Sequence, residues 1–302
     1  MDASLYRDLR PYGFSIAYRM LGSASEAEDV VQEAFLRLHR AAEEDEIQAP
    51  KSYLATVVTR LSIDRLRSAR ARREQYVGTW LPEPIVTDEK LEAANDADAA
   101  DSLSLAFLVL LESLTPVERA VFLLRDVFDY DYAEIARIVG KREANVRQIA
   151  ARARRHVDER RPRFEASRAE RDELAERFFA AASTRDRAAL AELLAPDVVF
   201  YGDGGGKVRG AIPQPVFGRD RVARLLLGFA QTGEELGLRV RLGAVNGQPG
   251  FVVFTPEGAP YSVLALDIVD GVVVAVRSIV NPDKIRHIGA DPVTQSSGRD
   301  GR

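Results

Sequence analysis

One short segment of this chain carries side chains whose types and spacing suit hydrogen bonding to DNA bases. Arginine, asparagine, glutamine and glutamate side chains donate to or accept from base edges in the major groove. Five such residues share the polar side of one predicted helix: Glu143, Asn145, Arg147, Gln148 and Arg152. Farther along the same helix, the basic side continues with arginines suited to phosphate contacts: Arg154, Arg155 and Arg160.

A helix–turn–helix would present this side of the helix to a major groove. Ala136 is small enough for two helices to approach closely, and Gly140 permits the positive φ that the turn requires. Val146 and Ile149 would pack the second helix onto the first. The alternative is an ordinary helical hairpin with a solvated basic face. The charge favours DNA binding, because residues 141–161 hold seven arginines and one lysine against three acids.

A second basic segment lies nearer the N-terminus. Residues 60–73 hold six arginines and a single acid, Asp64. The predicted helix has an apolar side with Leu61, Ile63 and Leu66, and an outward basic side with Arg60, Arg67 and Arg70. Tyr53 on the same helix could stack on an unpaired base, although a lone aromatic residue is more often part of a core.

The preceding predicted helix has an acidic side next to an apolar side. Its apolar positions follow helical spacing: Val30, Val31, Ala34, Phe35 and Leu38. Its acidic and amide positions are Glu28, Asp29, Gln32 and Glu33. One interpretation is a solvated surface, and the other is a docking face for a basic helix of a partner protein.

The composition excludes several kinds of site. The 302 residues include no cysteine, which excludes disulfides, thiolate zinc sites and cysteine nucleophiles. No long uncharged apolar run and no signal-peptide pattern is present, so we expect a cytoplasmic protein with no membrane partner. The net charge of −4 hides a pattern in which an acid-rich stretch, residues 88–101, separates the two basic segments. This arrangement indicates two contacts with one polyanion.

The first 160 residues are predicted to be mainly helical. The expected helices cover residues 6–42 with a break at 22–25, residues 50–73, residues 103–114 and a helix from residue 115, followed by two more. Ser25 and Glu28 have the spacing of a capping box. Thr115 and Glu118 have it too, with Pro116 at the first helical position.

After Arg163 the pattern changes to α+β. The expected helices cover 174–182, 187–194 and 220–230, and a strand covers 197–201. After the helices, an antiparallel meander covers 238–245, 250–254, 261–269 and 272–280. Asp270-Gly271 is a hairpin turn signal. The glycine-rich segment 202–207 permits close backbone approach, and its Lys207 could anchor an acidic or carbonyl partner; a plain hairpin is an equal alternative. Residues 289–302 are expected to be disordered.

Three of these segments, in this order, resemble the extracytoplasmic-function (ECF) sigma factors of bacterial RNA polymerase. Residues 28–37 resemble the segment that binds core polymerase, residues 50–67 the segment that melts and reads the −10 element, and residues 114–149 the domain that reads the −35 element. The sequence departs from many relatives at two positions, with Tyr53 in place of tryptophan and Ser62 in place of asparagine.

The second half resembles the subgroup with a fused SnoaL-like domain, whose cone-shaped fold is shared with ketosteroid isomerase. The resemblance lies in Trp80-Leu81-Pro82-Glu83-Pro84, in the glycine-rich segment and in Asn281-Pro282-Asp283-Lys284-Ile285. It implies that the fused domain, and no separate anti-sigma factor, modulates activity. The regulatory residues implied are Asp203, Gly204, Gly205, Gly206, Lys207, Asn281, Pro282, Asp283 and Lys284.

The resemblance also assigns domains and site residues. The domains are region 2 over 1–76, a linker over 77–103, region 4 over 104–163 and the SnoaL-like domain over 170–288. The residues implied for core binding are Glu28, Asp29, Gln32 and Glu33. Those implied for reading the −10 element are Tyr53, Arg60, Arg65, Arg67 and Arg70. Those implied for reading the −35 element are Arg142, Glu143, Asn145, Arg147, Gln148, Arg152 and Arg155. The implied partners are promoter DNA and the β and β′ subunits of RNA polymerase core, in transcription initiation during a stress response, with no cofactor and no metal.

Enzymatic activity in the C-terminal domain is not expected. Asp197, Tyr201, Asp203 and Asp267 could line a cavity, but their spacing declares no acid–base pair. A small-molecule ligand of this domain is left open. Two alternatives remain for the whole chain: a ligand-sensing transcription factor that acts without polymerase, and an isomerase-like enzyme with a DNA-binding appendage.

Overall fold

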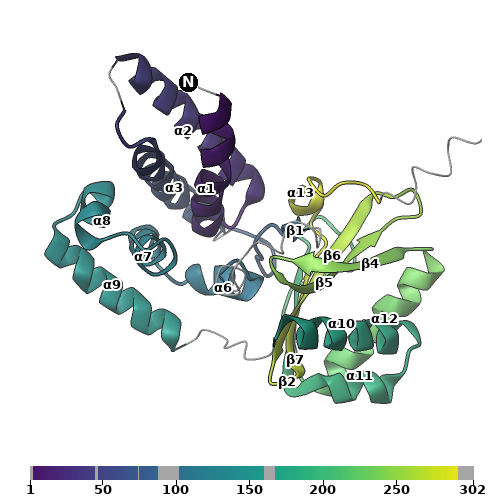
Figure 1. Ribbon diagram of the computed structural model, residues 1–302. Coiled ribbons are helices and arrows are strands. Elements are labelled where there is room, and N and C mark those ends of the chain that lie inside the picture. The colour runs from purple at the N-terminus through teal and green to yellow at the C-terminus, as the bar shows by residue number, and fades with distance from the viewer. Residues whose placement is uncertain (1–2, 45–46, 74, 88–101, 160–166, 292–302) are drawn as a thin grey trace, which may run out of the picture. The chain divides into compact units, whose positions relative to one another are not determined.

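The computed structural model describes residues 3–44, 47–73, 75–87, 102–159 and 167–291, with side chains of 69–73 left out (Figure 1). The chain divides into two compact units. The helical unit contains Met1–Gln75 and Phe107–Arg161, and the C-terminal unit contains Tyr76–Ala106 and Pro162–Arg302. Within the described residues, no helix is both long enough and apolar enough to span a bilayer.

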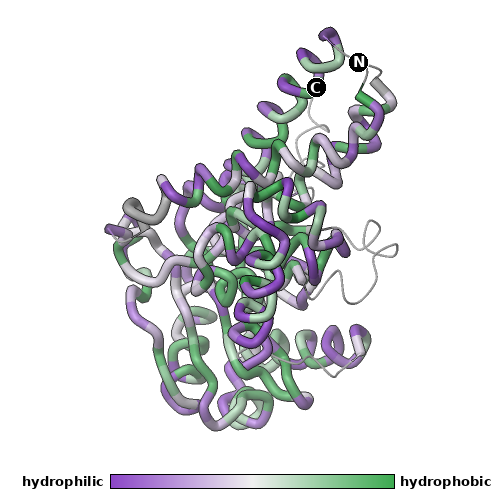
Figure 2. Tube along the Cα trace, turned by 90° about the vertical axis from the view of Figure 1, so that its left-hand side faces the viewer, coloured by the Kyte–Doolittle hydropathy of each residue, from purple (hydrophilic) through white to green (hydrophobic). Residues whose placement is uncertain are grey.

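The helical unit begins with three packed helices. They are α1 (Ala3–Leu21), α2 (Ala24–Glu44) and α3 (Pro50–Arg73). All five apolar positions predicted for α2 are buried, which confirms its spacing. The predicted capping box at Ser25 and Glu28 is wrong, because the Ser23 hydroxyl accepts from the Glu26 N–H at 3.1 Å and α2 starts before Ser25. Figure 2 shows polar and apolar residues alternating along the helices.

The rest of this unit contains four further helical elements and a π-helical turn. They are α6 (Leu105–Leu111), α7 (Pro116–Phe122), the π-helix η1 (Leu123–Val127), α8 (Tyr132–Val139) and α9 (Glu143–Asp158), with α6 starting in the C-terminal unit. The capping box of Thr115 and Glu118 with Pro116 is confirmed. The expected helix over 103–114 is shorter, because Thr115 precedes a proline and is held in an extended conformation as the cap of α7.

A buried arginine joins the two halves of the helical unit. The Arg119 guanidinium donates to the carbonyl of Met20 at 2.6 Å and to that of Leu111 at 3.0 Å, and it pairs with Glu112 at 2.7 Å. Burial lowers the pKa of Arg119 to about 9, so the group stays charged at neutral pH. The hydroxyls of Tyr12 and Tyr130 lie 2.5 Å apart and form a second link.

The C-terminal unit is a mixed sheet covered on one face by helices. Its helices are α10 (Arg168–Ser183), α11 (Arg187–Leu193), α12 (Arg219–Glu235) and α13 (Pro282–Ile285). Its strands are β1 (Val86–Thr87), β2 (Leu194–Asp203), β3 (Val216–Phe217), β4 (Arg239–Val245), β5 (Gln248–Phe254), β6 (Pro260–Val269) and β7 (Val272–Ile279). Helices α10, α11 and α12 lie on one side of this sheet (Figure 1), and their apolar residues form one core with β2, β5, β6 and β7.

The antiparallel meander expected over 238–280 is confirmed by β4, β5, β6 and β7. The strand order of the whole sheet is β1-β4-β5-β6-β7-β2-β3, and β2 runs parallel to β7. Parallel strands need a long crossover connection, and β3, α12, β4, β5 and β6 provide one between β2 and β7. The hairpin at Asp270-Gly271 is confirmed, with φ of 50° and 73°. Adjacent side chains along each strand point to opposite faces of the sheet, so one face meets the helices and the other faces away from them.

The segment predicted as a linker contributes to the C-terminal unit. Strand β1 pairs with β4 at the edge of the sheet, and Leu81 and Leu105 are completely or almost completely buried. The part of the predicted linker that the structure describes is therefore packed into the C-terminal unit. The acid-rich stretch 88–101 lies outside the described residues. At the other end, Asp291 is buried and donates its N–H to the Gly258 carbonyl, while 292–302 lie outside the described residues.

Replacing Arg119 by leucine should destabilise the helical unit by about 3–5 kcal/mol, because the Glu112 carboxylate and the Met20 and Leu111 carbonyls each lose the hydrogen bond from the guanidinium. Thermal unfolding of the full chain checks this, with the exposed Arg155→Leu as the matched control. The control is expected to change stability by no more than about 0.5 kcal/mol. Equal melting temperatures for the two variants would contradict the role of Arg119.

Candidate DNA-reading helix and linker clamp

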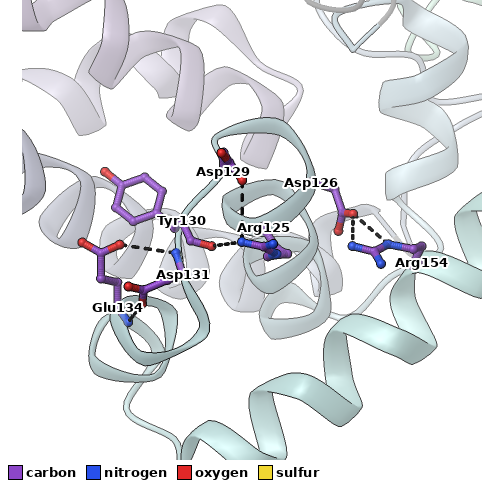
Figure 3. Close-up of polar contacts among 7 residues, drawn as sticks. All are labelled: Arg125, Asp126, Asp129, Tyr130, Asp131, Glu134 and Arg154. Carbon is purple, nitrogen blue, oxygen red and sulfur yellow. Dashed lines mark hydrogen bonds and ion pairs between the residues drawn. The ribbon is translucent and has the colours of Figure 1, made fainter.

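The first helix of the helix–turn–helix is fixed at its start by a capping box. The Asp131 carboxylate accepts from the Glu134 N–H at 2.7 Å, and the Glu134 carboxylate accepts from the Asp131 N–H at 3.3 Å (Figure 3). Sequence reasoning missed this cap, although Asp131 and Glu134 have the spacing that identifies one. The cap fixes where α8 begins and so where the turn after it falls.

Two arginines brace the connection before α8. Arg125 donates to the Tyr130 carbonyl at 2.9 Å and lies 3.6 Å from Asp129, which closes the loop after η1 (Figure 3). Arg154 on α9 donates to Asp126 at 2.8 Å, and this hydrogen bond raises the pKa of Arg154. Arg154 was predicted to contact phosphates, and here its guanidinium ties α9 to η1.

The turn of the helix–turn–helix has the predicted conformation and packing. Gly140 ends α8 in the left-handed conformation, at φ 65°. Ala136 and Val146 are buried at the contact between the two helices, and Ile149 is half-buried. The helix–turn–helix therefore forms from the residues that predicted it.

The predicted base-reading residues share the outward side of this motif. Glu143 is half-buried, and the exposed members are Arg142, Asn145, Arg147, Gln148, Arg152 and Arg155. Arg147 is oriented by two neighbours, the Glu143 carboxylate at 2.6 Å and the Tyr132 ring, whose centroid lies 4.5 Å from the guanidinium. Arg152 lies 3.8 Å from Glu118. These exposed pairs are weak, so the side chains can exchange them for DNA contacts.

The predicted −10-reading residues on α3 are engaged with other protein groups. Arg60 donates to the carbonyls of Arg137 and Ile138, each at 2.9 Å, at the C-terminal end of α8. A cation is favourable there because the last carbonyls of a helix carry partial negative charge. The remaining predicted residues are placed as follows: Arg65 lies 3.5 Å from Asp29, Arg67 lies 3.2 Å from Asp64, Tyr53 is half-buried, and the Arg70 side chain lies outside the described residues.

The acidic side of α2 is exposed and lightly paired. Glu28 lies 2.6 Å from Arg10 and Glu33 lies 2.5 Å from Arg37, while Gln32 is exposed. Leu36 stands on the same side with 53% of its surface exposed. Sequence reasoning missed Leu36, although its place one turn after Gln32 and Glu33 could have identified it. An apolar side chain among acids suits the docking of an amphipathic basic helix.

A buried carboxylate binds the segment that follows α3. Asp203 has no exposed surface, and it accepts from the Leu81 N–H at 2.8 Å, from the Tyr76 hydroxyl at 2.5 Å and from the Lys284 ammonium at 2.7 Å. Lys284 also donates to the Leu81 carbonyl at 2.5 Å, and Asn281 donates to the Tyr76 hydroxyl at 2.8 Å. We call Tyr76, Leu81, Asp203, Asn281 and Lys284 the linker clamp.

Burial and the hydrogen bond to Asp203 raise the pKa of Tyr76, which keeps this hydroxyl a donor. The Lys284 ammonium also lies 4.5 Å from the centroid of the Trp80 ring and 4.8 Å from that of Tyr76. A desolvated ammonium on two aromatic faces adds cation–π attraction to its ion pair. Tyr76 was missed from the sequence, because nothing in its local pattern connects it to Asp203.

The glycine-rich segment permits the close approach that the clamp requires. A Cβ at Gly205 would lie 2.9 Å from Cγ of Asn281 and 3.0 Å from the Tyr76 hydroxyl. A Cβ at Gly206 would lie 3.0 Å from Cβ of Val77. Both glycines also have positive φ, of 57° and 71°. The structure thus favours an anchoring role for this segment over a plain hairpin.

The other residues implied as regulatory lie beside the clamp. Lys207 donates to the exposed Asp283, and this contact lowers the pKa of Asp283. Asn281 caps α13 by accepting from the Asp283 N–H at 3.1 Å, and Pro282 is the first residue of that helix. Lys207 thus pairs with an exposed acid of its own unit, and its role as a regulatory residue stays a prediction.

A second holding point was not predicted. The Asn246 side chain accepts from the Ile85 N–H at 2.9 Å and donates to the Leu103 carbonyl at 2.9 Å. Asn246 is buried and has a positive φ of 55° in the β4–β5 turn. One amide side chain therefore binds the chain on both sides of residues 88–101. Asn246-Gly247 is itself a hairpin signal that could have drawn notice to this position.

The acids suggested to line a cavity do not line one. A cavity of about 700 Å³ opens between the sheet and its helices, and Asp197, Tyr201, Asp203 and Asp267 are not among its lining residues. Asp203 belongs to the clamp and Asp267 pairs with Arg277 at 2.9 Å, both on strand positions that face away from the helices. The period of two along β2 explains the error for Tyr201 and Asp203, since their neighbours Phe200 and Gly202 line the cavity.

Replacing Lys284 by methionine should loosen the segment around Trp80. The change leaves the buried Asp203 carboxylate without its cation, a loss of about 3–5 kcal/mol. Trp80 is the only tryptophan, so a red shift of the protein's emission reports its exposure to water. Lys207→Met is the matched control, since the exposed pair of Lys207 with Asp283 contributes only about 0–1 kcal/mol. Identical spectra for both variants would contradict the clamp.

Family models match three parts of the chain. They are Sigma-70 region 2 over residues 5–72, Sigma-70 region 4 over residues 104–157 and the SnoaL-like domain over residues 175–280. These matches agree with the fold expected from the sequence, two helical sigma domains followed by an α+β SnoaL-like domain.

Full-length relatives share the same organisation. The chain is 39% identical over 294 residues to the ECF RNA polymerase sigma factor SigJ of Mycobacterium tuberculosis, covering 94% of this chain and 93% of that protein. It is 32% identical over 292 residues to the probable ECF RNA polymerase sigma factor SigI of the same species, covering 96% of each. The crystal structure of M. tuberculosis SigJ matches with a TM-score of 0.75 at 36% identity, covering 94% of this chain and 98% of that one. This protein belongs to the ECF RNA polymerase sigma factors, in the group that carries a C-terminal SnoaL-like domain.

Proposed function

We propose that this protein directs RNA polymerase core to specific promoters in the cytoplasm and carries out no covalent chemistry itself. The observation that carries the proposal is the outward side of α9, where Asn145, Arg147 and Gln148 are exposed on the helix that follows the left-handed turn at Gly140. These side chains suit the base edges of a −35 element, and the neighbouring arginines suit its phosphates.

Core polymerase would dock on the acidic side of α2. Glu28, Asp29 and Glu33 are paired with arginines of the same unit, and the paired side chains are about one third to two thirds exposed. Exposed pairs of this kind contribute little, so a basic partner helix can replace those arginines. Leu36 would supply the apolar centre of the interface, and the β′ subunit is the partner we propose for this surface.

The −10 contact would require a rearrangement of the helical unit. Arg60 donates both of its hydrogen bonds to the end of α8, so in this arrangement it is occupied by the domain that reads the −35 element. Binding of polymerase or DNA would exchange these carbonyls for phosphate oxygens. This supports a free protein that binds promoters poorly until polymerase separates its two DNA-reading halves.

The SnoaL-like domain would modulate activity by holding the linker, in place of a separate anti-sigma factor. Asp203 and Lys284 bind the chain at Leu81, and Asn246 binds it at Ile85 and Leu103. These contacts fasten the chain after region 2 and before region 4. The distance that the linker can span between the two regions would therefore depend on whether these contacts are intact.

Run-off transcription with purified core RNA polymerase on a promoter library tests the proposal. The wild-type protein should support specific initiation. Because each lost base contact costs about 1–3 kcal/mol, the combined change of Arg147 and Gln148 to alanine should reduce initiation at least about tenfold. The control is Arg224→Ala, an exposed arginine on α12 that should leave initiation unchanged.

No initiation by the folded wild-type protein, together with tight promoter binding in the absence of polymerase, would contradict the proposal. That result would favour a transcription factor that acts without being a polymerase subunit. The ratio of initiation by Lys284→Met to initiation by wild type would give the sign of the control exerted by the SnoaL-like domain.

A further inference from the structure

The cavity in the C-terminal unit has the walls of a small-molecule site. Its volume of about 700 Å³ lies within the range of about 300–1,000 Å³ typical of ligand pockets. Six aromatic side chains contribute to its lining: Phe178, Phe179, Phe200, Phe229, Phe251 and Tyr261. Flat, rigid walls of this kind favour a ligand that contains rings.

Polar groups lie at two places in this cavity. Ser262 and Ser278 are almost buried, with 6% and 7% of their surface exposed, and they are diagonal neighbours on the paired strands β6 and β7. Their hydroxyls can donate to or accept from a ligand oxygen. Arg185, Arg209 and Glu234 also contribute to the lining, and Arg185 lies 3.6 Å from Glu234.

The charge of the cavity favours an anion. Among the described residues, no carboxylate lies within ion-pair distance of the exposed Arg209, so the arginines outnumber the acid they can pair with. The titratable lining side chains in the described part of the chain are these two arginines, Glu234 and Tyr261. Arg209 can therefore anchor a carboxylate or sulfonate group of a ligand. Because Glu234 is already beside Arg185, these residues favour ligand binding over proton transfer.

The cavity and the linker clamp share two strands. Gly202 on β2 lines the cavity, and the next residue is Asp203 of the clamp. Val280, just after β7, lines the cavity, and the next residue is Asn281 of the clamp. Side chains that alternate along an extended chain reach both sites, so a shift of either strand moves a wall of the cavity and a clamp residue together.

The glycine-rich loop provides a third connection. Its returning part, Val208–Ile212, lines the cavity. Its outgoing part contains Gly205 and Gly206, which contact Tyr76 and Val77 of the linker. The two parts touch, since a Cβ at Gly204 would overlap the Ala211 side chain. A ligand that pushes the returning part outward would therefore also move the outgoing part, which contacts the linker.

We propose that this cavity is an effector site for a ring-containing organic anion, and that its occupancy is coupled to the linker clamp. Six aromatic walls receive the rings, Ser262 and Ser278 meet a polar group at the buried end, and Arg209 pairs with the anion. The coupling to transcription rests on the proposed function of the clamp, whereas binding and its coupling to the clamp do not.

Two fluorescent probes applied to the full-length protein test the site. Anilinonaphthalene sulfonate is an aromatic anion, and phenylnaphthylamine is its uncharged counterpart. Both should bind the wild-type protein. Ser262→Trp fills the cavity and should weaken both probes at least tenfold. Arg209→Ala should weaken the anionic probe at least threefold and leave the uncharged probe unchanged, and Arg224→Ala, on α12 and outside the cavity lining, is the matched control.

Circular dichroism checks that each variant is folded. If Ser262→Trp does not fold, Arg209→Ala still tests the site, because Arg209 is exposed. Probe affinities that are the same in Arg209→Ala and Arg224→Ala would overturn the anion site. Probe binding that a folded Ser262→Trp variant leaves unchanged would overturn the cavity as the location.

The coupling is tested by the reverse effect, because two coupled sites change each other's affinity by the same factor. Lys284→Met breaks the clamp without touching the cavity lining, and it should change the dissociation constant of the anionic probe at least threefold. Lys207→Met should leave this constant unchanged. The same constant in wild type and Lys284→Met would overturn the effector role. These assays contain no polymerase and no DNA, so their failure is distinguishable from failure of the sigma-factor function.

Discussion

A buried carboxylate needs donors, and Asp203 finds them outside its own strand. Its oxygens accept from a tyrosine hydroxyl, a backbone N–H and an ammonium, and two of these three donors come from the segment that follows α3. Leaving such a group unpaired costs several kcal/mol, so the linker segment and the SnoaL-like domain stabilise each other. The edge strand β1 and the double hydrogen bond of Asn246 extend the same attachment along the chain.

The helical unit has a comparable constraint of its own. The buried Arg119 and the pair of Arg60 with the end of α8 use backbone carbonyls of one half as acceptors for arginines of the other. Of these, the contact of Arg60 occupies a residue that we propose for the −10 element. Activation of this sigma factor would then be an exchange of internal hydrogen bonds for contacts with polymerase and DNA, and the balance between the two would be small enough to regulate.

Local pattern predicted most elements and the helix–turn–helix. Gly140, Thr115 with Glu118 and Asp270-Gly271 take the conformations expected of them, because capping and turns depend on neighbouring residues alone. The parallel pairing of β2 with β7 was missed, since strand spacing carries no information on strand order. The partners of Asp203 were missed for the same reason: Tyr76 and Leu81 lie more than a hundred residues away, and only the folded sheet brings them together. Composition likewise could not decide whether Asp203 and Asp267 point toward the cavity or toward the opposite face of the sheet.

Hydrogen exchange at the Leu81 and Ile85 amides of the free full-length protein tests the central claim most directly, because these N–H groups donate to Asp203 and Asn246. If the SnoaL-like domain holds the linker, both amides exchange at least about a hundredfold more slowly than in an unfolded peptide. The Leu81 amide should also lose that protection in Lys284→Met. Exchange at the rate of an unfolded peptide in the wild-type protein would contradict the account.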